Sequence, residues 1–88
     1  MAGTDREAAD ANDAVPRIVR TPDVLGGDPR IEGTRIGVAH VYRRHVDGGE
    51  SPSEIASGYD ISIAAVHAAL AYGFANPEEM DAIAKRQE

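Results

Sequence analysis

The sequence contains no cysteine and no tryptophan, only one lysine, and few aromatic residues of any kind. Without cysteine, neither a disulfide nor a thiolate zinc site can stabilise the chain. A domain of 88 residues is small and buries only about 60% of the surface that its unfolded chain exposes. Because no covalent or metal link compensates for the small core, the composition favours stabilisation by oligomerisation.

Long apolar runs are also missing. The most apolar stretch, residues 63–75 (IAAVHAALAYGFA), is interrupted by His67 and Gly73. It is shorter than the roughly 20 residues that cross a bilayer. Residues 1–16 are acidic and have no apolar centre, so they do not resemble a signal peptide. We therefore expect no membrane association and a cytoplasmic location.

The net charge of −6 opposes nonspecific attraction to nucleic acid or to an anionic membrane. The positive charges are nevertheless concentrated, because six of the arginines lie between residues 17 and 46 while both ends of the chain are acidic. The acidic bias is also compatible with a salt-rich cytoplasm, an alternative that the sequence leaves open. Any contact with nucleic acid is expected in the basic centre.

The first part of the chain divides into a leader and a short β element. Residues 1–16 have no apolar periodicity and predict a disordered acidic leader. Residues 17–20 (RIVR) are a candidate strand, and residues 30–38 predict a tight hairpin around Glu32 and Gly33. Because such short strands are marginal in water, we expect them to pack on helices or to pair between two protomers of a homodimer.

Helical periodicity begins at residue 38. Five residues are expected to share one face of this first helix: Val38, Val41, Tyr42, His45 and Val46. Gly48 and Gly49 end it. The sequence SPSE at residues 51–54 then places serine at the N-cap, proline at the first helical position and glutamate at the third, which is a capping box. This second helix is expected to end near Gly58.

Two further helices are expected in the last third of the chain. Ser62 is a candidate N-cap for a longer helix that ends at Asn76. Its inward face is predicted to comprise Ile63, Val66, Leu70 and Phe74, with Ala69 and Gly73 allowing close approach of a neighbour. A final helix begins at Pro77. The sequence thus predicts a mainly α fold in which residues 17–76 form a trihelical, helix-turn-helix-like unit after a short β element, and residues 77–88 form a C-terminal helix or tail.

The sequence offers no catalytic chemistry. It has no serine in a nucleophile motif and no glycine-rich phosphate loop with its lysine. His40 and His45 lie about 140° apart around a helix, so they do not converge on a metal as residues four apart do. We expect neither an enzyme nor a protein that needs a metal or another cofactor.

Three segments together resemble the domain of unknown function 433 family. They are GGDPRIEGTRIGV at residues 26–38, SPSEIASGY at residues 51–59 and VHAALAY at residues 66–72, and the resemblance spans about residues 24–72. Members of that family are similar to VapB-type antitoxins, which are typically encoded beside a PIN-like ribonuclease that they neutralise. The resemblance implies a homodimer with a helix-turn-helix that binds a PIN-like toxin protein and can repress its own operon.

The candidate nucleic-acid contacts are the arginines of the basic centre, Arg30, Arg35, Arg43 and Arg44. Alternatives remain open for them: Arg35 can be architectural, and Arg43 and Arg44 can be the solvated face of a helix. The helix expected at residues 63–75 contains no arginine or lysine, so only Ser62, His67 and Asn76 are available for base contacts.

The candidate toxin contact is the final helix. Its apolar stripe contains Met80 and Ile83, with Glu79 among the flanking acids, and it is narrow for a core of its own. Such a helix can lie in an apolar groove with a basic rim. The alternative is that this helix packs within its own dimer. The leading functional hypothesis is an antitoxin, and the alternative is a free-standing small DNA-binding transcriptional regulator.

Overall fold

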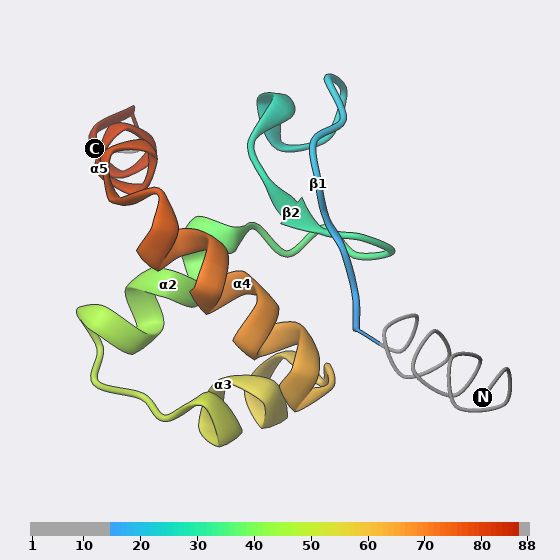
Figure 1. Ribbon diagram of the computed structural model, residues 1–88, viewed down its shortest axis with the longest axis vertical. Helices are drawn as coiled ribbons and strands as arrows, with labels where there is room; N and C mark the ends of the chain where they lie inside the picture. Colours follow the sequence, from blue (N-terminus) through green and yellow to red (C-terminus); the bar gives the residue numbers. More distant parts are fainter. Residues whose placement is uncertain (1–14, 87–88) are drawn as a thin grey trace, which may run out of the picture.

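The computed structural model describes residues 15–86, so the predicted leader at residues 1–16 lies almost wholly outside the described residues. The described part is mainly helical, with four helices and a two-stranded antiparallel sheet (Figure 1). The elements in chain order are strand β1 (Ile18–Val19), the short 3₁₀ helix η1 (Leu25–Gly27), strand β2 (Arg30–Ile31), and helices α2 (Val38–Val46), α3 (Pro52–Tyr59), α4 (Ile63–Ala75) and α5 (Pro77–Arg86). This confirms the predicted mainly α fold with a short β element before the helices.

The small sheet forms within one chain. β1 and β2 are antiparallel, with Ile18 opposite Ile31. After β2 the chain turns back sharply, and a further bridge joins Arg30 to Gly37. The Thr34 hydroxyl closes this turn by donating to the Ile31 carbonyl oxygen at 2.8 Å. The tight turn expected in residues 30–38 is therefore present, and the sheet does not need a strand from a second chain.

The helix starts follow the local signals in the sequence. Ser51 Oγ accepts a hydrogen bond from the Glu54 N–H at 3.1 Å, and Glu54 Oε1 accepts one from the Ser51 N–H at 2.9 Å. These two bonds are the predicted capping box. Ser62 Oγ likewise accepts from the Ala65 N–H at 3.1 Å. α3 ends one residue later than expected, because Asp60 and not Gly58 takes the left-handed conformation that closes it, with φ of 58°.

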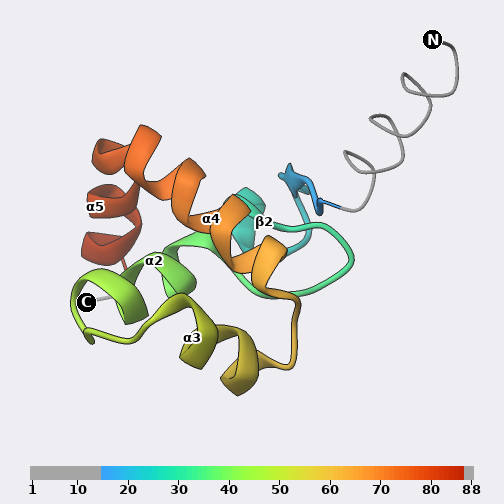
Figure 2. The same cartoon turned by 60° about the horizontal axis from the view of Figure 1, so that its bottom comes forward.

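The core lies between α2 and α4, and α3 and α5 pack against this pair at opposite ends (Figures 1 and 2). Val41 and Val66 are fully buried at its centre. A β-carbon at Gly73 would collide with the ring of Tyr42, so this glycine lets the two helices approach closely. The close approach expected at Gly73 is thus found.

The inward faces predicted for α2 and α4 are partly wrong. Val46, Ile63 and Phe74 were expected inside, but they are 48%, 47% and 57% exposed. Val66 and Leu70 are buried as predicted, and together with Ala65, Ala69 and Gly73 they form the buried side of α4. For α4 the physical reason is that the helix has no charged residue, so its sequence does not indicate which side faces solvent. The close approach at Gly73 then turns the side with the small residues toward α2.

Candidate functional site

Arg44 links α2 to α3 at a partly exposed position. Its guanidinium forms two hydrogen bonds with the Glu50 carboxylate, at 2.8 and 2.6 Å, and lies 4.7 Å from the centre of the Tyr59 ring. The hydrogen bonds raise the pKa of Arg44 and lower the pKa of the Glu50 carboxyl. Glu50 precedes α3 and Tyr59 is its last residue, so Arg44 ties α2 to both ends of α3.

Arg30 also serves the fold. Its guanidinium donates to the Thr34 carbonyl oxygen and to Thr21 Oγ1, each at 2.9 Å. Both bonds are partly buried. They fix the turn after β2 against the segment that follows β1, so Arg30 is not available as a free phosphate contact in this arrangement.

Arg35 and Arg43 are the more available pair. Arg35 is exposed and forms no ion pair with another residue of the described range 15–86. Arg43 Nε lies 3.4 Å from Asp47 Oδ2, and the two side chains are 43% and 65% exposed. The four arginines predicted to contact nucleic acid therefore divide into two that hold the fold and two at the surface.

The stripe predicted to bind a toxin is part of the protein's own core. Met80 and Ile83 are each only 2% exposed, because α5 folds back onto α2 and α4. Glu79 forms an ion pair with Arg20 at 2.7 Å and accepts a hydrogen bond from the Tyr72 hydroxyl at 2.8 Å. The expectation that Glu79, Met80 and Ile83 form an open binding surface does not fit this arrangement.

The contact between Glu79 and Tyr72 has an electrostatic consequence. Burial raises the pKa of the Tyr72 hydroxyl, and the hydrogen bond to Glu79 raises it further. Arg20 completes the cluster by donating to the same hydroxyl. The cluster joins the end of the β1 segment to α4 and α5, so its role is to hold these elements together.

α4 presents an uncharged surface on the side away from the core. We define the outer face of α4 as Ile63, His67, Ala71 and Phe74, which are all exposed and follow one another at helical spacing. The Phe74 ring meets the Tyr42 ring edge to face, with centres 5.3 Å apart, so the apolar surface continues onto α2. Ile63 and Phe74 are the large apolar side chains of this face and lie at its two ends, and exposed apolar surface without charge is a feature of contacts with proteins.

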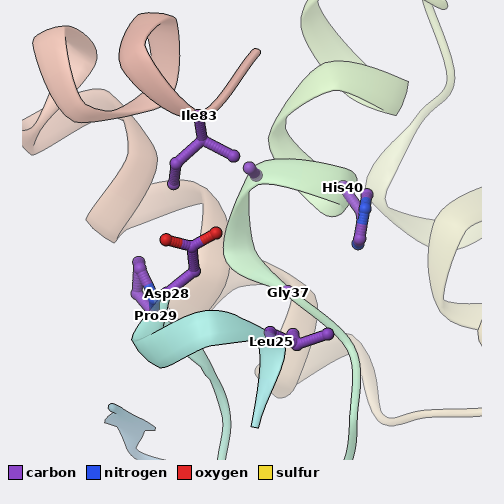
Figure 3. A pocket seen from close by; sticks show the side chains of 7 residues that line it. Leu25, Asp28, Pro29, Gly37, His40 and Ile83 are labelled. Atoms are coloured by element: carbon purple, nitrogen blue, oxygen red, sulfur yellow. The ribbon is translucent and has the colours of Figure 1, made fainter. Parts of the chain in front are cut away.

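A cavity of about 260 Å³ lies between η1, the start of α2, and α5 (Figure 3). Its lining consists of Leu25, Asp28, Pro29, Gly37, Ala39, His40 and Ile83. Figure 3 shows Ile83 of α5 on one side, Leu25 and Gly37 on the opposite side, and the Asp28 carboxylate between them. Asp28 Oδ1 accepts a hydrogen bond from Arg86 at 2.7 Å.

The cavity wall depends on an unusual backbone. Leu25 has φ of 52°, in the left-handed region that residues with a branched side chain rarely adopt. Gly37 faces it, and a β-carbon there would lie 3.3 Å from Leu25 Cδ1 and 3.2 Å from His40 Nδ1. The sequence predicts the tight hairpin at residues 30–38 but not the cavity, because Ile83 closes the cavity from the far end of the chain.

Nothing in the described residues 15–86 assembles metal ligands, since no three histidine, aspartate or glutamate side chains cluster there. No helix in this range is both long and apolar enough to cross a membrane. What the range does offer for binding is the outer face of α4, the exposed arginines and the cavity.

The fold and these surfaces define a small helical protein with a two-stranded β element, a cavity at one end of its core and an uncharged helix face. Residues 18–73 match the family described as "Protein of unknown function (DUF433)", and since this is more than half of the chain, the protein belongs to that family. A solved structure of a DUF433 member from Anabaena variabilis is similar, with 29% identity and a TM-score of 0.61 over 91% of this chain and 77% of that one. Comparison with curated proteins gave no match.

Proposed function

We propose that this protein is a non-catalytic, antitoxin-like module that binds and neutralises a PIN-like ribonuclease, with the outer face of α4 as the main contact. α3, residues 60–62 and α4 have the outline of a helix-turn-helix, in which α4 takes the place of the recognition helix. The observation that carries the proposal is the chemistry of that helix. It contains no charged residue and exposes Ile63 and Phe74.

This chemistry favours a protein partner over DNA. Recognition helices contact base edges through arginine, asparagine or glutamine, and phosphates through cations. The outer face of α4 has none of these residues, whereas exposed aromatic and aliphatic side chains are typical of the centre of protein interfaces. Burying this face against a protein would leave no charge without a partner.

The charges around the face suit a nuclease. Asp60 precedes α4 and Glu78 follows it, and both are exposed. A ribonuclease needs a positively charged cleft to hold RNA, and acidic groups beside an apolar contact complement such a cleft. The net charge of −6 also favours association with a positively charged protein.

The homodimer belongs to the same proposal, but its predicted location changes. β1 pairs with β2 of the same chain, so the strands no longer need a second protomer. Light scattering over a range of concentrations will give the oligomeric state. A concentration-independent monomer mass would contradict the dimer without touching the proposed contact with the nuclease.

A transcriptional regulator is the second candidate, and the exposure of Arg35 and Arg43 is what favours it. Their contacts would be to phosphates, so the affinity for the protein's own operator should fall steeply with added salt. In a plot of the logarithm of the binding constant against the logarithm of the salt concentration, the slope should be about −0.9 for each phosphate contact. Arg35→Ala with Arg43→Ala is the suitable double variant, because Arg44 holds Glu50 and its loss would disturb the fold. An unchanged operator affinity in this variant would place any DNA contact elsewhere.

The direct test of the antitoxin is inhibition. The product of the neighbouring gene, which we expect to be a PIN-like ribonuclease, is purified and titrated with the protein, and cleavage of a labelled RNA is followed. We expect RNA cleavage to fall to background at a fixed molar ratio of protein to nuclease. The mass of the purified complex should correspond to the same ratio. Undiminished cleavage at a large excess of folded protein would contradict the proposal.

A further inference from the structure

We infer that the cavity between η1, α2 and α5 is an anchoring site for one tryptophan side chain of the partner protein (Figure 3). The inference rests on the proposed function, because the partner is the nuclease named there. It adds a second contact, formed by different residues from those of the outer face of α4.

The size of the cavity favours a single side chain. Its volume of about 260 Å³ lies below the roughly 300 to 1,000 Å³ of sites for drug-sized molecules. Leu25, Pro29 and Ile83 give it apolar walls, and Ile83 and Pro29 are almost fully buried. Asp28 and His40 give the lining its polar side chains. An occupant must therefore combine an apolar body with a polar group, as the large aromatic anchors of protein interfaces do.

The polar groups of the lining favour an aromatic side chain that carries a hydrogen-bond donor. Arg86 already bonds Asp28 Oδ1, so the charge of this carboxylate is offset, while Oδ2 has no hydrogen bond with another residue of the range 15–86. A neutral N–H donor suits such a group better than a second cation. The indole of tryptophan supplies that donor on a large apolar ring. The chain itself contains no tryptophan, so the occupant must come from another molecule.

The backbone at Leu25 is the independent observation that points to a ligand. A leucine in the left-handed region is unfavourable, and such conformations persist mainly where binding or catalysis needs them. Glycine at position 25 would remove the strain, as it does at the two following positions, which also have positive φ. The leucine instead places its side chain in the cavity wall, against Gly37.

The first test uses a model compound. N-acetyltryptophanamide is titrated into the full-length protein, and backbone amide shifts are followed by NMR. We expect saturable shifts confined to residues 25–40 and the neighbourhood of Ile83. N-acetylphenylalaninamide, which lacks the ring donor, should bind about fivefold more weakly, because one hydrogen bond is lost. Scattered or non-saturable shifts, or equal affinity for the two amides, would overturn the inference.

Variants connect the cavity to the partner. Ala39→Leu fills the cavity, and Ala82→Leu makes the same change at an exposed position of α5. We expect Ala39→Leu to weaken both the tryptophan amide and inhibition of the nuclease at least tenfold, and Ala82→Leu to change neither. Leu25→Gly is the second variant, in case the Ala39→Leu protein does not fold. Leu25→Gly should weaken both the binding of the tryptophan amide and the inhibition of the nuclease without lowering the melting temperature.

The outcomes separate the two proposals. Full inhibition of the nuclease by a folded Ala39→Leu protein would overturn the anchoring site while leaving the proposed function intact. Failure of the unaltered protein to bind the nuclease would contradict the proposed function, and it would equally overturn the partner assigned to the cavity. In that case the amide titration still decides whether the cavity binds an indole at all.

Discussion

α4 and α5 follow each other directly, yet they distribute their apolar residues in opposite ways. α5 buries Met80 and Ile83 and turns all its charged residues except Glu79 to solvent, so its sequence pattern and its packing agree. α4 has no charged residue, buries its small side chains together with Val66 and Leu70, and leaves Ile63 and Phe74 exposed. The difference teaches that an amphipathic pattern identifies the buried face of a helix. In a helix without charged residues, the sequence does not distinguish the buried face from an exposed face that is available for binding.

The largest expected effect comes from the packed stripe of α5. Met80→Ala or Ile83→Ala should each lower the free energy of unfolding by about 2 to 5 kcal/mol, because each removes buried methylene groups from the core. Ile63→Ala on α4 should cost only about 1 kcal/mol, since its side chain is about half exposed, and Phe74→Ala about 1 to 2 kcal/mol, because its half-exposed ring also packs on Tyr42. Urea denaturation of the four variants measures the difference. Equal costs on the two helices would show that α5 does not pack as described.

The inner side of α4 gives the next effect. Gly73→Ala should destabilise the protein by about 1 to 3 kcal/mol, because the new β-carbon collides with the Tyr42 ring. The sign is diagnostic, since helix propensity alone would make alanine more stable than glycine by about 1 kcal/mol. Thermal denaturation decides between them, and a raised melting temperature would contradict the close approach of α2 and α4.

Two adjacent arginines of α2 differ in the same way, since one makes close contacts within the fold and the other makes few. Arg44→Ala should lower the melting temperature more than Arg43→Ala, because Arg44 has two short bonds to Glu50 and a contact with Tyr59, while Arg43 has one long contact with Asp47. The comparison is made by calorimetry under identical conditions. If both variants melt together, the link between α2 and α3 does not depend on Arg44.

The smallest effect is a dependence on pH. The bonds from Arg44 lower the pKa of Glu50 in the folded protein, so this pair stabilises the fold fully above the unfolded pKa of about 4.3 and progressively less as the pH falls through the folded pKa. Glu50→Gln should therefore be less stable than the unaltered protein at neutral pH, and the gap should close in acid. A gap that stays constant from pH 7 to pH 2 would mean that another feature of Glu50 stabilises the fold.

The parts of the fold that follow from neighbouring residues could be predicted from the sequence. The capping box at Ser51 and the cap at Ser62 depend on residues three positions apart, and both helix starts were found where they were expected. The tight turn after β2 is equally local. Such signals need no knowledge of the tertiary arrangement.

The parts that depend on distant contacts could not be predicted. Arg44 pairs with Glu50, which follows the turn at Gly48 and Gly49. The sequence does not predict the direction of the chain after this turn, so Arg44 was assigned to nucleic acid. Met80 and Ile83 were assigned to a toxin because the stripe is narrow, but the core they join is supplied mostly by α2 and α4. The cavity unites residues 25–40 with Ile83, and no single segment contains it.

The most direct test of the central claim, that the outer face of α4 contacts a protein, is the inhibition constant of a double variant against the PIN-like ribonuclease. Ile63→Ser with Phe74→Ser removes the apolar side chains of this face without changing a fully buried residue, and Arg35→Ala with Arg43→Ala is the matched control on the two arginines at the surface. We predict that the serine variant stays folded, with a melting temperature lowered only by the lost contact between Phe74 and Tyr42, and loses at least a hundredfold in inhibition, while the arginine variant inhibits like the unaltered protein. Full inhibition by the serine variant, or loss of inhibition in the arginine variant alone, would contradict the account.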